Sequence, residues 1–105
     1  KVGEGTVAMA GVCVNTGTVI GRHCILNTSC AIDHDCLLED FVHISPGVAL
    51  AGKVQVGEGT HIGIGASVIP GIRIGKGCII GAGAAVIRDV PDGTTVVGVP
   101  GSVIR

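Results

Sequence analysis

A six-residue pattern is plainest in the stretch Ile74-Gly75-Lys76-Gly77-Cys78-Ile79, and it continues from there in both directions. Each unit begins with an aliphatic residue, often followed by glycine, and has a small or β-branched residue at its fifth position. Counted in sixes from Val2, fifteen units begin with Val2, Ala8, Val14, Ile20, Leu26, Ile32, Leu38, Ile44, Leu50, Val56, Ile62, Val68, Ile74, Ile80 and Val86. No residue is inserted or lost between them.

This period of six matches neither an α-helix, with about 3.6 residues per turn, nor a plain alternating strand. It fits short strands joined by tight corners, at which glycine relieves the backbone. Three units would close one triangular coil, so fifteen units predict about five coils. The sequence thus predicts an all-β fold, a parallel β-helix over residues 1–91 with no protruding loop.

The composition agrees with an interior of stacked aliphatic columns. The chain of 105 residues is 47% hydrophobic, has 19 glycines and contains a single aromatic residue, Phe41. The rhythm ends at Pro91-Asp92-Gly93, a turn signal. We therefore expect residues 92–105 to form a separate closing segment.

Charge and cysteine content exclude several classes of partner. No apolar run is long enough to span a membrane, and a net charge of −1 without a basic run argues against nucleic acid.

The five cysteines form no C-x-x-C pair, which favours a reducing, cytoplasmic location. Cys24, Cys30 and Cys36 all take the fifth position. We interpret them as small buried residues in preference to a three-thiolate metal site.

Ionisable groups concentrate between Ile32 and His43, a stretch that contains two of the four histidines and four of the eight acids. His34 is the third residue of its unit and is expected to point outward near a corner. Gly52 takes the same position three units later, one coil away on the same side, where its backbone N–H would be uncovered. A base beside a free N–H is what acyl transfer requires. The alternative is a solvated surface histidine beside an ordinary corner glycine.

The repeat also resembles that of the bacterial hexapeptide-repeat acyltransferases, which are left-handed parallel β-helices. Within that family the stretch from Leu26 to Cys36, with Phe41-Val42-His43-Ile44-Ser45 and Ala51-Gly52, is similar to one branch. This branch holds the sialic acid O-acetyltransferase-like and UDP-4-amino-sugar N-acetyltransferase proteins of the bacillosamine and perosamine type. The resemblance implies that the β-helix is left-handed.

The resemblance also implies roles for individual residues. His34 would be the general base, Asp35 would raise its basicity with Asp33 as the competing partner, and the Gly52 N–H would hold the oxyanion. Acetyl-CoA would contact His43, Gly52, Ile64 and Ala82, and Asn27 would bind the acceptor.

The implied reaction moves an acetyl group from acetyl-CoA directly to an amino or hydroxyl group of a sugar or nucleotide-sugar. The resemblance further implies a cytoplasmic homotrimer with sites between subunits, and an N-terminal α/β sugar-binding domain ahead of this chain. The family closes on Ala-Lys where this chain has Gly101-Ser102, so the role of that lysine is not carried over.

Two other classes of function stay open. His43 and His61 take the same position in units one coil apart and should stack, as in a metal hydratase such as the trimeric β-helix carbonic anhydrases. That site needs a third histidine, but Val56 and Ala66 occupy the positions five before and five after His61, so we expect no metal. The other alternative is a non-catalytic trimerisation module.

Overall fold

Sixteen short strands follow one another in the computed structural model, which describes residues 1–105. The chain contains no helix, and hence none that could cross a bilayer. The strands are β1 (Val7–Ala8), β2 (Cys13–Val14), β3 (Val19–Ile20), β4 (Ile25–Leu26), β5 (Ala31–Ile32), β6 (Leu37–Leu38), β7 (His43–Ile44), β8 (Ala49–Leu50), β9 (Gln55–Val56), β10 (His61–Ile62), β11 (Ser67–Val68), β12 (Arg73–Ile74), β13 (Ile79–Ile80), β14 (Ala85–Val86), β15 (Thr95–Val97) and β16 (Ser102–Val103).

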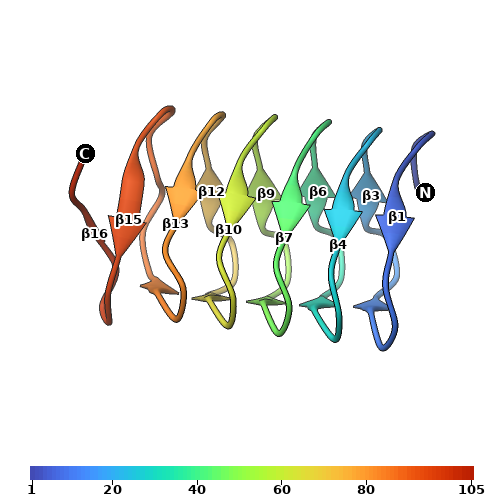
Figure 1. Cartoon of the computed structure of the whole chain (residues 1–105), viewed down its shortest axis with the longest axis horizontal. Coiled ribbons are helices and arrows are strands. Elements are labelled where there is room, and N and C mark those ends of the chain that lie inside the picture. Colours follow the sequence, from blue (N-terminus) through green and yellow to red (C-terminus); the bar gives the residue numbers. More distant parts are fainter.

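Every third strand joins the same sheet, so the chain winds around a triangular prism. The front sheet, β1-β4-β7-β10-β13-β15, faces the viewer in Figure 1, and β3-β6-β9-β12 lie behind it. The third sheet, β2-β5-β8-β11-β14, closes the triangle. Partners such as Ile25 and His43 are parallel and lie one coil apart. The predicted parallel β-helix of about five coils without a protruding loop is confirmed.

The first residue of each unit points into the prism. From Ile20 to Val86 all twelve leading residues are at most 3% exposed. In the first coil, by contrast, Val2 and Val14 are 59% and 40% exposed, because no coil covers them on that side. The hydrophobic core is therefore one continuous column that begins with the second coil.

The fifth position is buried as well, and it links successive coils. Thr18 Oγ1 donates to the Asp33 carbonyl at 2.7 Å and accepts the Cys36 N–H at 3.1 Å. Cys36 Sγ lies 3.2 Å from the carbonyl oxygen of Ala51. Threonine and cysteine thus occupy this column in the same way. Cys24, Cys30 and Cys36 are buried and free.

The fourth residue of a unit takes the left-handed backbone conformation that turns each corner. Eleven glycines have positive φ, and the other corner residues with positive φ are His23, Ser29, Asp35, Phe41 and Lys53. Bulky residues rarely adopt this conformation. Two of them stack here, with the His23 and Phe41 ring centroids 5.4 Å apart.

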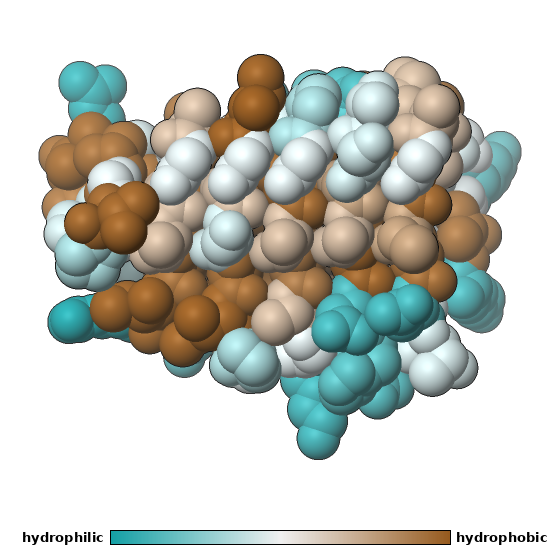
Figure 2. All heavy atoms as spheres, turned by 90° about the horizontal axis from the view of Figure 1, so that it is seen from below, coloured by the Kyte–Doolittle hydropathy of each residue, from teal (hydrophilic) through white to brown (hydrophobic).

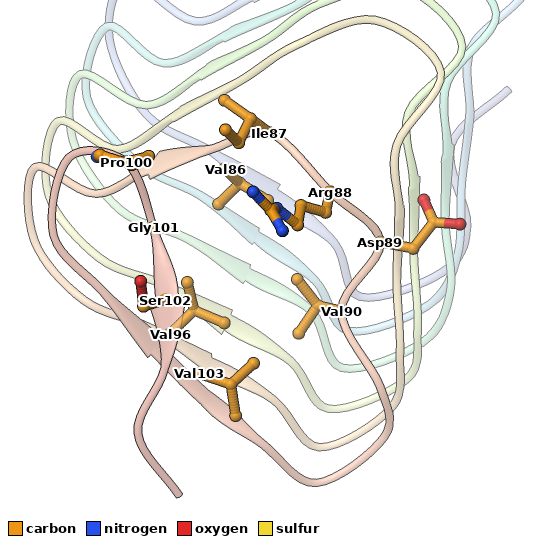
Figure 3. Close-up of a pocket in the computed structure, with 10 residues that line it drawn as sticks. All are labelled: Val86, Ile87, Arg88, Asp89, Val90, Val96, Pro100, Gly101, Ser102 and Val103. Atoms are coloured by element: carbon orange, nitrogen blue, oxygen red, sulfur yellow. The ribbon is translucent and has the colours of Figure 1, made fainter.

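The closing segment adds two strands, β15 and β16, to the front sheet. Thr95 of β15 pairs in parallel with Ile79 of β13, at a spacing shorter than a full coil, and β16 returns antiparallel along β15. Between the hairpin and the last coil lies a cavity of about 300 Å³ at the end of the core. Figure 3 shows Arg88 extending across this cavity while Asp89 points away from it.

The third sheet presents a face of small side chains. Its outward residues are Cys13, Ala31, Ala49, Ser67 and Ala85. Figure 2 views the molecule from this side, where a pale row runs along the face and hydrophilic residues gather along part of one margin.

Candidate active site

His34 lies at the corner between β5 and β6, and half of its side chain is exposed. Its Nδ1 atom lies 3.1 Å from Asp35 Oδ2. A carboxylate can only accept a hydrogen bond, so Nδ1 carries the proton in the neutral ring and Nε2 keeps its lone pair. The imidazole is thus oriented as a base.

The Nε2 side of the ring lies against Gly52 in the next coil. A Cβ atom added to Gly52 would be 2.5 Å from His34 Nε2. The Gly52 carbonyl accepts a hydrogen bond from Gly71 at 3.0 Å, whereas the Gly52 N–H donates to no group of the chain. The structure therefore brings His34, Asp35 and Gly52 together and places a free donor beside the imidazole.

Asp33 is engaged elsewhere, although it precedes His34 directly. Its Oδ1 atom accepts hydrogen bonds from Asn15 Nδ2 at 2.9 Å and from the His34 backbone N–H at 2.7 Å. The Asn15 hydrogen bond, followed by that of His34, lowers the pKa of the Asp33 carboxyl below its usual value. Of the two candidate partners, Asp35 contacts the ring and Asp33 caps the backbone.

His43 and His61 form the expected stacked pair on β7 and β10, with ring centroids 4.4 Å apart. Burial, and secondarily the charge of His61, lowers the pKa of His43. Ser45 Oγ lies 3.2 Å from His61 Nε2. No group of three His, Cys, Asp or Glu side chains is placed to bind a metal ion.

Asn27, Ile64 and Ala82 lie at the corners that follow the front sheet. Asn27 Oδ1 accepts the Thr28 N–H at 2.8 Å and so caps its own turn. Ile64 is 62% exposed. The backbone N–H groups of Ile64 and Ala82, one coil apart, donate to no group of the chain. They form a row of two free donors.

The predicted site residues therefore fall into two groups within one chain. His34, Asp35 and Gly52 occupy the corner between the third sheet and the rear sheet, whereas His43 lies on the front sheet, opposite that corner. Two further residues that contact this group, Asn15 and Gly17, were not predicted from the sequence. Their signal was the coil spacing, because each lies one full coil before its partner, Asp33 or Asp35.

Comparisons with known proteins identify relatives of this fold. The family described as "Bacterial transferase hexapeptide (six repeats)" matches residues 53–88. The acetyltransferase domain of PglB from Neisseria gonorrhoeae FA1090 is 45% identical, with a TM-score of 0.97 over 98% of this chain and 50% of that chain. PerB from Caulobacter crescentus, solved with CoA and GDP-perosamine, is 47% identical, with a TM-score of 0.99 over 100% of this chain and 51% of that chain.

A curated relative, UDP-3-O-acylglucosamine N-acyltransferase of Methylorubrum extorquens (strain PA1), is 39% identical over 99% of this chain and 24% of its own length. The chain thus spans about half of the matched structures and about a quarter of this relative. Its fold is the left-handed β-helix of hexapeptide-repeat proteins, and residues 53–88 match the model of that family. Its close structural matches belong to the bacillosamine- and perosamine-type branch, which confirms the resemblance seen in the sequence.

Proposed function

We propose that this chain is the catalytic β-helix of an acetyltransferase that moves an acetyl group from acetyl-CoA to an amino or hydroxyl group of a sugar or nucleotide-sugar. One observation carries the proposal: His34 is held at Nδ1 by Asp35, and its Nε2 side faces Gly52, whose N–H is free. The match to structures that contain acetyl-CoA, CoA and GDP-perosamine supports it.

In this mechanism His34 Nε2 removes a proton from the acceptor amine or hydroxyl as that group attacks the thioester carbon. The Gly52 N–H donates to the oxygen on which negative charge develops. Collapse of the tetrahedral intermediate breaks the carbon–sulfur bond, and His34 returns the proton to the departing thiolate of CoA. The acetyl group passes directly to the acceptor without an acyl-enzyme.

The second group of residues would hold the substrates. The free N–H groups of Ile64 and Ala82 are suited to carbonyl oxygens of the acetyl-CoA arm, and His43 would contact the thioester as a neutral imidazole. Asn27 would offer its side-chain amide to the acceptor. The nucleotide part of the acceptor would be held by an N-terminal domain outside these residues. The cysteines are free thiols, which fits a location in the reducing cytoplasm.

A homotrimer would unite the two groups. Since His43 lies on the side of the triangle opposite the His34 corner, one chain cannot bring both to the same thioester. A neighbouring copy can supply His43, and a closed three-fold ring repeats that contact without an open end. Each of three clefts would then contain His34 from one subunit and His43 from the next.

The replacement His34→Ala tests the catalytic role. We expect turnover with an amino-sugar acceptor to fall by about 10²–10⁴-fold, with acetyl-CoA affinity retained. Near-normal turnover of His34→Ala would refute the general base. Failure of the unmodified protein to bind acetyl-CoA by calorimetry would favour a trimerisation module.

Mixing inactive His34→Ala and His43→Ala chains tests the shared site. Subunit exchange should restore part of the activity, because some clefts then receive one intact residue from each parent. No recovery after exchange, verified by mass spectrometry of mixed trimers, would place both residues in one chain's site.

A further inference from the structure

The corner Asn15-Thr16-Gly17 lies directly beneath the corner that carries His34, one coil earlier in the chain. The Asp35 N–H donates to the Thr16 carbonyl at 3.0 Å. Asn15 holds the Asp33 carboxylate, which in turn accepts the His34 N–H. The backbone on both sides of His34 is therefore fixed by this earlier corner.

Gly17 makes the contact that matters most for the base. A Cβ atom added to Gly17 would collide with Asp35 Oδ1 and lie 3.0 Å from Asp35 Cγ. The carboxylate thus rests in the space that the missing side chain leaves. From there, its other oxygen reaches His34 Nδ1 at 3.1 Å.

We infer that Gly17 is a positioning residue for the catalytic pair: its lack of a side chain sets the Asp35 carboxylate against His34 Nδ1 and so selects the ring tautomer that leaves Nε2 free. This inference rests on the proposed function of His34 as a base. Gly17 touches no substrate and acts only through Asp35.

The replacement Gly17→Ala has a matched control in Gly59→Ala. Both glycines turn a corner with nearly the same backbone angle, φ +77° at Gly17 and +73° at Gly59, so an added methyl group strains the backbone equally. A Cβ atom on Gly59 would meet nothing within 4 Å, whereas on Gly17 it would displace the carboxylate.

Nitrogen-15 NMR of the histidine rings gives a readout independent of turnover. We expect the unmodified protein and Gly59→Ala to show the Nδ1–H tautomer at His34, and Gly17→Ala to show a substantial Nε2–H population. In kinetics, Gly17→Ala should lower kcat by about 10- to 100-fold, the effect of a misplacement of about 1 Å, with KM for acetyl-CoA nearly unchanged.

The double variant Gly17→Ala/Asp35→Asn should be no slower than Asp35→Asn alone, because both changes act on one contact. If Gly17→Ala folds poorly, adding Asp35→Ala to that variant should restore folding, because it removes the carboxylate with which the new methyl group collides. A variant Gly17→Ala that equals Gly59→Ala in tautomer and kcat, while His34→Ala is inactive, overturns this inference alone. An active His34→Ala would instead overturn the proposed function.

Discussion

Gly52→Ala is the sharpest test of the site because it adds one methyl group at the point where the proposed base, His34, and the free N–H meet. Gly52 does not have positive φ, so alanine can adopt its backbone conformation without strain. The added Cβ atom would lie 2.5 Å from His34 Nε2, 2.8 Å from Cε1 and 3.1 Å from Cδ2. The imidazole must therefore move while the coil stays intact.

The size of the effect follows from these distances. Ordinary contact requires at least 3.4 Å, so the ring has to retreat by about 1 Å, and a misplacement of this size costs about 10²-fold in rate. That corresponds to about 2.7 kcal/mol of transition-state stabilisation. The methyl group also covers the N–H proposed to hold the oxyanion, so a larger loss is consistent with the same geometry.

Steady-state kinetics measure the effect of the displaced imidazole on turnover, and unfolding measurements give the stability cost of the close contact between the added methyl group and the His34 ring. We expect kcat to fall at least about 10²-fold, with the β-helix intact by circular dichroism. In the His34→Ala background the methyl group has room, so the stability cost of Gly52→Ala should disappear. Retention of kcat by Gly52→Ala, or an equal stability cost in both backgrounds, would show that the imidazole does not rest on Gly52.

Three further outcomes are expected from the core and from the histidine pair. Ile62→Ala should lower the free energy of unfolding by about 2–5 kcal/mol in a urea titration, because it leaves a cavity in a fully buried column; a loss well under this range would indicate a loosely packed interior. Thr60→Val should cost about 1–3 kcal/mol in the same assay, since the buried hydroxyl accepts the Cys78 N–H at 3.0 Å, and an unchanged stability would argue against that role. The lowered pKa of His43 means that the folded state binds its proton less readily than the unfolded state. The contribution of His43 to stability is therefore complete above pH 6.5, its ordinary pKa, and is lost as pH falls from there through the lowered pKa of the folded state. His43→Gln should flatten this decline, and an unaltered profile would exclude His43 as its source.

Several features of this protein could be predicted from the sequence because each coil repeats the same pattern of inward-facing, outward-facing and corner residues. The unbroken spacing of leading residues such as Ile20, Leu38 and Ile62 predicted the triangular coils and the buried aliphatic columns of the core. The position of a residue within its six-residue unit also predicted where its side chain points. His34 and Gly52 were therefore expected on the same side in neighbouring coils, and His43 and His61 in one stack, as the structure shows. The end of the rhythm did not reveal that β15 pairs with β13 at a shorter spacing, because the repeat no longer sets the register there.

The sequence by itself thus determined the coil, the inward and outward residues, and the pairs that meet between one coil and the next. Only the tertiary structure decided between Asp33 and Asp35, which flank His34 equally in sequence. That choice depends on Asn15 and Gly17 in the preceding coil: an amide holds one carboxylate away, and an absent side chain admits the other. Side-chain direction at a corner is set by which neighbouring coil offers a hydrogen bond and which offers space, and those are contacts between residues far apart along the chain.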